Sequence, residues 1–150
     1  MIFRKATLPD VDAICGLVNH YAEQGLVLPR SRHSIFESLR DFTVAEEDGK
    51  IVGVGALVFA WDGLAEVRAN AVSPEFLRKG IGGEIVKELI TEAARYGIKK
   101  LFVLTYCPEF FSAHGFREVP KEQLPHKVWR DCINCSKFPN CDETALIFDL

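Results

Sequence analysis

The spacing of hydrophobic residues near the N-terminus is that of amphipathic helices. Apolar side chains recur every three to four positions at Val11, Ile14, Val18 and Tyr21, which predicts a helix over about residues 8–24. Thr7-Leu8-Pro9-Asp10 provides a cap, a proline and an acid for its first turn, and Gly25 suits its C-terminal end. Ile35, Phe36 and Leu39 form a shorter stripe, which predicts a second helix beginning near Ser31 or Arg32.

Strands are predicted around these helices. A short strand at 2–5 precedes the first helix, and strands at 43–46 and 51–59 follow the second. Asp48-Gly49 readily adopts the two positive φ values of a tight turn, so the last two strands should form an antiparallel hairpin.

The stretch 64–72 alternates between small apolar and polar residues. Ala65, Val67, Ala69 and Ala71 should share one face, and Glu66, Arg68 and Asn70 the other. A strand with one polar face is either an edge exposed to water or the floor of a cleft. The glycine-rich turn that follows it favours the cleft.

The second half of the chain predicts a strand–helix–strand crossover. Apolar residues from Ile81 to Ala93 mark the buried side of a long helix that ends before Gly97. The apolar run 101–105 is typical of a strand covered on both faces, and it should lie parallel to the strand 64–72. A short helix over 108–114 and a last strand at 145–149 complete an α/β (α+β) fold in one domain, residues 1–150. No structure is assigned to residues 118–141.

Composition and charge exclude several classes of protein. Hydrophobic residues make up 48% of the 150, enough for one core, and a net charge of −3 with no basic run argues against nucleic acid as a partner. The longest uncharged stretch, Ile51–Trp61, has eleven residues, whereas a bilayer span needs roughly 20, so no membrane partner is expected. Arg4 and Lys5 interrupt any secretion signal, which predicts a cytoplasmic protein. Five cysteines, an odd number, favour reduced thiols or metal ligands over a disulfide framework.

The turn Arg78-Lys79-Gly80-Ile81-Gly82-Gly83 carries the strongest local signal for a ligand. It opens a long helix, whose first turn has unpaired backbone N–H groups that carry about half a positive charge. Glycines let a ligand approach the backbone, and Arg78 and Lys79 add cations to a protein that is acidic overall. Phosphate is the natural ligand of such a turn, and the alternative is a glycine-rich connection that binds nothing. The spacing matches neither the phosphate loop of nucleotide phosphatases nor the full dinucleotide fingerprint.

This turn and two later segments, Phe102-Val103-Leu104-Thr105 and Ala113-His114-Gly115-Phe116, resemble the GNAT superfamily of N-acetyltransferases over nearly the whole chain. Within it, the chain resembles the acetyltransferase domain of N-acetylglutamate synthases in Leu28-Pro29-Arg30-Ser31-Arg32, Ala65-Glu66-Val67, Phe110-Phe111 and Leu124-Pro125. The resemblance implies a mixed, mostly antiparallel sheet with helices on both faces. It also implies that the parallel strands 64–72 and 101–105 part like an open V.

The donor that the resemblance implies is acetyl-coenzyme A. Its diphosphate would lie on the backbone amides of Arg78 to Gly83, and its pantetheine arm between the parting strands, beside Ala71 and Val72. Leu77 stands where the superfamily usually has Gln or Arg, and Phe111 where it often has the tyrosine that protonates the departing thiolate. A thiol has a pKa of about 8.5, so releasing thiolate at pH 7 costs only about 2 kcal/mol, and the missing acid is tolerable.

Direct attack of an amine on the thioester also needs a base and a stabilised oxyanion. Glu66 is the first candidate base, acting through a water, and its alternative role is as a partner for Arg68. The resemblance implies that backbone N–H groups near Val67 to Ala69 receive the oxyanion. Tyr106 and Cys107, at the end of the strand 101–105, are candidate proton donors to the thiolate.

The acceptor that the resemblance implies is L-glutamate, whose two carboxylates call for arginines. Arg30 and Arg32 are the first candidates, and Arg68 and Lys127 the next, with surface ion pairs as the alternative role of each. The predicted reaction is acetylation of glutamate at the start of arginine synthesis. Another amine, such as a protein N-terminus or a polyamine, is the rival acceptor. A coenzyme-binding or metal-sensing module without turnover is the rival class, and a homodimer is left open.

Three cysteines gather near the C-terminus. Cys132, Cys135 and Cys141 lie within ten residues, and His126 precedes them. Together they would complete a tetrahedral zinc site, and the alternative is a set of reduced thiols.

Overall fold

The computed structural model describes residues 1–124 and 143–150. These residues form a seven-stranded sheet in the order β1-β2-β3-β4-β5-β7-β6. The strands are β1 (Ile2–Lys5), β2 (Phe42–Glu47), β3 (Lys50–Trp61), β4 (Leu64–Val72), β5 (Lys100–Thr105), β6 (Arg117–Val119) and β7 (Thr144–Asp149). Within this sheet β4 and β5 are parallel and the other neighbours are antiparallel, which confirms the predicted fold class.

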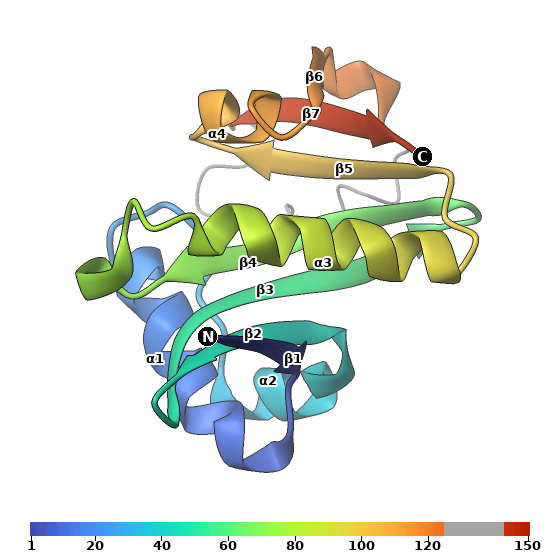
Figure 1. Ribbon diagram of the computed structural model, residues 1–150. Helices are drawn as coiled ribbons and strands as arrows, with labels where there is room; N and C mark the ends of the chain where they lie inside the picture. The colour runs from blue at the N-terminus through green and yellow to red at the C-terminus, as the bar shows by residue number, and fades with distance from the viewer. Residues whose placement is uncertain (125–142) are drawn as a thin grey trace.

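Helices cover both faces of the sheet. They are α1 (Val11–Ala22), α2 (Arg32–Glu37), α3 (Ile81–Arg95) and α4 (Pro108–Ser112). Figure 1 shows α3 lying across β3 and β4, with α1 and α2 behind the sheet and α4 beside β7. None of the helices in the described ranges is long and apolar enough to cross a bilayer.

The two helical layers bury separate cores. On one face, Ile81, Ile85, Val86 and Leu89 of α3 pack against Ala65 and Val67 of β4. On the other, Val11, Ile14 and Val18 of α1 pack with Ile35, Phe42 and Ala71. The glycines of β3 let α3 come close, because a Cβ added at Gly55 would lie 2.6 Å from Ile85 Cγ2.

Most predicted elements are confirmed, with small shifts at their ends. The first helix begins with a 3-10 turn at Leu8–Asp10, and Asp48 and Gly49 have φ values of 50° and 77° in the hairpin turn. The strand β6 was not predicted, because three residues are too few to show a hydrophobic period. It pairs with β7, which lies between β5 and β6.

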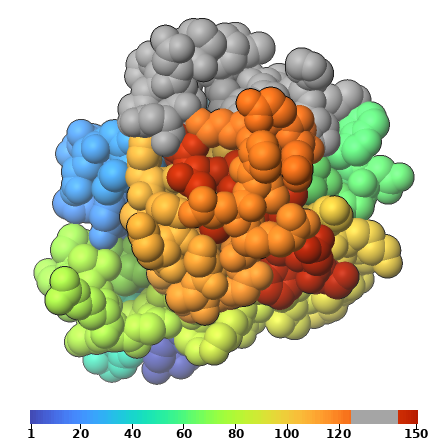
Figure 2. Space-filling view, turned by 90° about the horizontal axis from the view of Figure 1, so that it is seen from above, coloured from blue at the N-terminus to red at the C-terminus, as the bar shows by residue number. Residues whose placement is uncertain are grey.

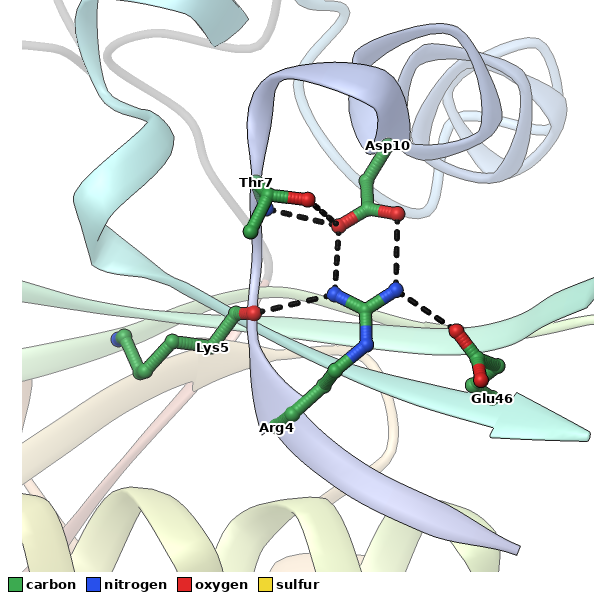
Figure 3. A network of polar contacts seen from close by, with 5 residues as sticks. All are labelled: Arg4, Lys5, Thr7, Asp10 and Glu46. Carbon is green, nitrogen blue, oxygen red and sulfur yellow. Dashed lines mark hydrogen bonds and ion pairs between the residues drawn. The ribbon is translucent and has the colours of Figure 1, made fainter. Parts of the chain in front are cut away.

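An ion-pair network fastens the start of α1 to the sheet (Figure 3). Arg4 of β1 donates to both carboxylate oxygens of Asp10, at 2.7 and 3.0 Å, and to Glu46 of β2 at 2.8 Å. The backbone N–H of Thr7 and its hydroxyl also donate to Asp10, at 2.7 and 3.1 Å. Arg4 lowers the pKa of Asp10, whose carboxylate is almost fully buried.

The alternation predicted for β4 is wrong after Arg68. Ala65 and Val67 face α3, but Ala69 and Ala71 pack into the α1 core, and Asn70 lies near Gly55 on the α3 side. The register with β3 shifts between Val54 and Ala56, so β4 has one extra residue there, and Ala69 has a φ of 52°. This β-bulge moves the later side chains to the opposite faces of the sheet.

Candidate active site

The strands β4 and β5 part after three paired positions. Leu64, Ala65 and Glu66 pair with Lys100, Leu101 and Phe102, but β4 continues to Val72 and β5 to Thr105. The ribbons separate toward the start of α3 and toward α4 (Figure 1). Beyond Glu66, the β5-facing edge of β4 has no strand partner among the described residues. An extended ligand chain can therefore hydrogen-bond to the backbone at this edge.

The turn at residues 78–83, for which the sequence predicts an anion as ligand (the predicted anion-binding turn), lies at the end of this open edge. Arg78 has a φ of 64° and Gly80 a φ of 80°, and both residues are exposed, as is Lys79. The first intrahelical bond of α3 runs from Glu84 N–H to the Gly80 carbonyl at 3.1 Å, so the amides of Ile81, Gly82 and Gly83 belong to the unpaired first turn. The Lys79 ammonium lies 5.0 Å from the centre of the Phe76 ring. The turn thus presents backbone N–H groups and two cations at one helix end.

Two of the glycines have a packing role that the sequence did not reveal. A Cβ at Gly83 would lie 2.3 Å from His114 Nε2, and one at Gly82 would lie 3.3 Å from the Phe110 ring. His114 Nδ1 is hydrogen-bonded to the Phe110 carbonyl at 2.8 Å, which holds the imidazole against α3. In Figure 2 the orange segment that contains α4 covers most of β7, and the yellow-green segment before α3 lies beside it. Gly82 and Gly83 therefore let α4 approach α3.

Glu66 and Arg68 lie on the α1 face of the sheet. Glu66 is the cross-strand neighbour of Val58 in β3, and Arg68 is the neighbour of Ala56. Both of these β3 residues belong to the α1 core. The Arg68 guanidinium donates through Nε to the buried Glu66 carboxylate. The ion-pair role considered for Glu66 is thus present. Glu66 is also the last residue of β4 that pairs with β5, so it lies at the point where the two strands part.

Arg30 lies over the same face. Its guanidinium carbon is 5.9 Å from the centre of the Phe42 ring, and Phe42, Ala56 and Arg68 form one cross-strand row. With strands about 4.8 Å apart, the Cα atoms of Phe42 and Arg68 are about 10 Å from each other. Arg30 Nε donates to the Ser34 hydroxyl at 2.8 Å, and Nη2 to the Ser38 hydroxyl at 2.7 Å. These hydroxyls orient the guanidinium.

Arg32 points elsewhere. Its Nε donates to Asp12 of α1 at 2.7 Å, its guanidinium lies 4.7 Å from the centre of the Phe36 ring, and both partners of the ion pair are largely exposed. Asp12 is the main cause of the raised pKa of Arg32. Of the two arginines in Leu28–Arg32, the structure therefore brings Arg30 to the face that holds Glu66 and Arg68.

Asp41 is a titratable group beside this face that sequence reasoning missed. Burial raises the pKa of its carboxyl above the ordinary value, and Lys5, Arg30 and Arg68 oppose that rise. Asp41 therefore lies within electrostatic range of both Arg30 and Arg68. It ends the 3-10 turn Leu39–Asp41 directly before β2, where no motif distinguishes it from a surface acid.

The remaining predicted site residues divide between two regions. Tyr106 is half-buried and Cys107 is exposed at the start of α4, where its N–H donates to the Thr105 hydroxyl at 2.9 Å. Both follow β5 at the end where it has left β4. Lys127, Cys132, Cys135 and Cys141 lie outside the described residues, as does His126. Within 1–124 and 143–150 no group of three metal-ligating side chains is found.

Sequence reasoning also missed two side chains on the last turns of α1. Asn19 hydrogen-bonds to the main chain of Arg30, and the Tyr21 hydroxyl donates to the Val72 carbonyl at 2.5 Å. Tyr21 was assigned only to the apolar stripe of the helix. A phenol on a buried stripe usually has a hydrogen-bond partner, and that was the available signal.

Comparison with known proteins identifies the family of the chain. Residues 16–117 match the Acetyltransferase (GNAT) family. The chain is 42% identical over 144 residues to an uncharacterized N-acetyltransferase of Chlorobaculum tepidum, covering 96% of this chain and 93% of that one. It is 40% identical over 131 residues to an amino-acid acetyltransferase of Mycobacterium tuberculosis, covering 85% and 75%.

Two solved structures share the fold closely. An N-acetylglutamate synthase from Neisseria gonorrhoeae, complexed with coenzyme A and N-acetyl-glutamate, superposes with a TM-score of 0.90 at 29% identity, over 99% of this chain and 35% of that one. A Mycobacterium tuberculosis protein in complex with CoA superposes with a TM-score of 0.89 at 32% identity, over 100% and 99%. Amino-acid acetyltransferases of other bacteria match only about a third of their length or less. The chain belongs to the GNAT family of acetyltransferases, enzymes that take the acetyl group from acetyl-CoA.

Proposed function

We propose that this acetyltransferase transfers the acetyl group to the α-amine of L-glutamate, as at the start of arginine synthesis. The observation that carries the proposal is the placement of Arg30 and Arg68 on one sheet face beside the point where β4 and β5 part. Two arginines over one cross-strand row, Arg68 at one end and Arg30 above Phe42 at the other, suit a small molecule with two carboxylates. The relatives named amino-acid acetyltransferase support an amino acid as the acceptor.

The donor would lie along the open edge of β4. Its diphosphate would accept from the backbone amides of Arg78 to Gly83, with Lys79 and Arg78 adding positive charge. Its amide chain would pass Ala71 and Val72, which places the thioester near Glu66 and the bulge at Ala69. Backbone N–H groups near Val67 to Ala69 would receive the oxyanion.

The reaction then needs one proton removed and one supplied. The amine nitrogen attacks the thioester carbon, the C–N bond forms, and the C–S bond breaks as the oxyanion collapses. Glu66 accepts the amine proton through a water, and the carboxylates of glutamate engage Arg30 and share Arg68 with Glu66. The thiolate leaves without a dedicated tyrosine, and Tyr106 and Cys107, which follow the end of β5, would act as its proton donors. Lys127 is the secondary carboxylate partner in this scheme.

The test follows thiol release from acetyl-CoA with a panel of amines: glutamate, glutamine, aspartate, lysine, spermidine and a peptide N-terminus. Glutamate should give the largest kcat/KM, and Glu66→Gln should lower kcat while coenzyme affinity stays within about twofold. Faster release with an amine that lacks a side-chain carboxylate would reject glutamate and leave the family assignment intact. If none of these amines raises thiol release above the rate in buffer alone, the coenzyme-binding module without turnover would be favoured. A homodimer, a cytoplasmic location and the cysteine zinc site stay predictions, to be tested by sedimentation, fractionation and metal analysis.

A further inference from the structure

The backbone N–H and C=O of Val72 face the open edge of β4. Ser73 N–H donates to the Val52 carbonyl of β3 at 2.8 Å, and Val72 is the cross-strand neighbour of Gly53. In an antiparallel ladder, successive residues direct their N–H and C=O groups alternately to the two sides of the strand. Because Ser73 is bonded to β3, the backbone groups of Val72 point away from β3, to the side where β5 has parted.

The Val72 carbonyl accepts a hydrogen bond from a side chain of α1, the helix that packs on one face of the sheet. Tyr21, in the last turn of α1, donates its phenolic hydrogen to the Val72 oxygen at 2.5 Å, a contact between residues 51 positions apart. Burial raises the pKa of Tyr21, so the phenol keeps its proton at neutral pH and remains a donor. The ring is half-buried in the α1 core and meets the His20 ring edge-on at 5.0 Å.

Val72 also adjoins the predicted anion-binding turn. A Cβ at Gly82 would lie 3.6 Å from Val72 Cγ2, so this residue contacts the first turn of α3. Val72 therefore lies between the strand edge proposed for the pantetheine arm and the amides proposed for the diphosphate. The N–H and C=O of one residue in an extended strand point to the same side. With the Val72 carbonyl bonded to Tyr21, the Val72 N–H also has a set direction at that edge.

We propose that Tyr21 is a positioning residue for the acyl donor: its hydroxyl holds the backbone of Val72 so that the Val72 N–H meets an amide carbonyl of the coenzyme arm. The proposal rests on the coenzyme site proposed above and does not depend on which amine is acetylated. It differs from a purely structural role in what it predicts. A structural bond contributes to stability alone, whereas a positioning bond contributes to the affinity for coenzyme in a protein that is already folded.

The test is Tyr21→Phe, which removes the hydroxyl and keeps the ring. Tyr96→Phe is the matched control, because Tyr96 is 64% exposed and lies at the far end of α3. Coenzyme A affinity is measured by calorimetry, and the KM values for acetyl-CoA and for the acceptor are measured separately. Loss of one hydrogen bond that leaves a carbonyl without its partner should raise the Kd for coenzyme A and the KM for acetyl-CoA about five- to tenfold. The acceptor KM should stay within about twofold, and the control should match the wild type.

A second readout uses the folded protein directly. The backbone 1H–15N resonance of Val72 should shift on addition of coenzyme A to the wild type, and shift less in Tyr21→Phe at saturation. Coenzyme affinity within twofold of wild type in Tyr21→Phe, or an acceptor KM that rises in step with the acetyl-CoA KM, would overturn the proposal. A wild-type protein that binds coenzyme A but does not acetylate glutamate would reject the proposed function and leave this inference standing. A wild-type protein that does not bind coenzyme A would reject both.

Discussion

The side-chain amide of Asn19 brackets the main chain of Arg30. Asn19 Nδ2 donates to the Arg30 carbonyl at 2.9 Å, and Asn19 Oδ1 accepts from the Arg30 N–H at 3.0 Å. Two residues further along α1, Tyr21 holds Val72. The last turns of one helix thus fix both the arginine proposed for the acceptor and the strand edge proposed for the donor.

Replacing Asn19 by Ala should weaken acceptor binding selectively. Both bonds to the Arg30 peptide are lost, so Arg30 no longer has a set position over Phe42. We expect the acceptor KM to rise about tenfold, with unfolding free energy lower by about 1–2 kcal/mol, because two half-buried backbone groups lose their partners. Coenzyme affinity should be unchanged. The exposed Glu23→Ala is the control, and an acetyl-CoA KM that rises as much as the acceptor KM would contradict the expectation.

The two neighbouring arginines should respond differently to substitution by lysine. A lysine at position 30 keeps the charge but loses the planar fork that Ser34 and Ser38 orient. Loss of one or two charged hydrogen bonds predicts an acceptor KM raised about 10- to 100-fold in Arg30→Lys. Arg32→Lys should change it less than about twofold, because Arg32 is paired with an exposed Asp12. Steady-state kinetics measure the acceptor KM of both variants. A larger increase in Arg32→Lys than in Arg30→Lys would show that Arg32, and not Arg30, binds the acceptor.

Arg78 combines a charge at the predicted anion-binding turn with a left-handed backbone. Its φ of 64° is costly for any residue with a Cβ and free of strain for glycine. We expect Arg78→Gly to be more stable to urea than Arg78→Ala by about 1 kcal/mol. Both variants lose the cation, so both should bind coenzyme A several-fold more weakly than wild type. Equal stability of the two variants would mean that the turn relaxes in solution.

Acid should remove the stabilisation that Asp10 provides. Arg4 lowers the pKa of Asp10 in the folded state, so this stabilisation is fully present above the unfolded-state pKa of about 3.9 and is lost as pH falls through the lower folded-state value. At pH 7, Asp10→Asn should lose about 2 kcal/mol of unfolding free energy, since charged hydrogen bonds to a buried carboxylate are broken.

The difference between Asp10→Asn and wild type should shrink in urea titrations as the pH falls below the unfolded-state pKa of about 3.9. Asp149→Asn is the control, because its carboxylate is exposed although Arg117 also lowers its pKa. If the wild type keeps its higher unfolding free energy at the lowest pH, the stabilisation comes from the packing of the Asp10 side chain and not from its charge.

Two glycine-to-alanine substitutions should change the stability of the fold in opposite directions. A Cβ at Gly83 would meet the His114 ring at 2.3 Å, whereas one at Gly16 in α1 meets nothing within 4 Å. Gly16→Ala should raise stability by about 0.5–1 kcal/mol through helix propensity. Gly83→Ala should lower it by about 1–3 kcal/mol, because His114 and α4 must move. Thermal unfolding measures both, and a neutral Gly83→Ala would show that α4 gives way easily.

The hydrophobic pattern was enough to predict the helices and most of the sheet. Residues from Ile81 to Ala93 repeat at the helical period over four turns, and Asp48-Gly49 has the turn chemistry of a hairpin. These are local properties, determined by residues close in sequence. The predicted anion-binding turn could be located for the same reason, since the glycines and cations that define it are contiguous.

Other features depend on contacts between distant residues, and the pattern alone did not reveal them. The bulge at Ala69 contradicts the alternation of its own strand, because the register with β3 determines which way each side chain points. Arg30 and Arg32 are equivalent by composition, and only the positions of Ser34, Ser38 and Asp12 in space distinguish them. The bond from Tyr21 to Val72 joins α1 to β4 across the fold. The sequence by itself therefore determined the elements and the family resemblance, and the tertiary structure decided which side chains meet at the site, because hydrogen bonds and packing depend on distance in space.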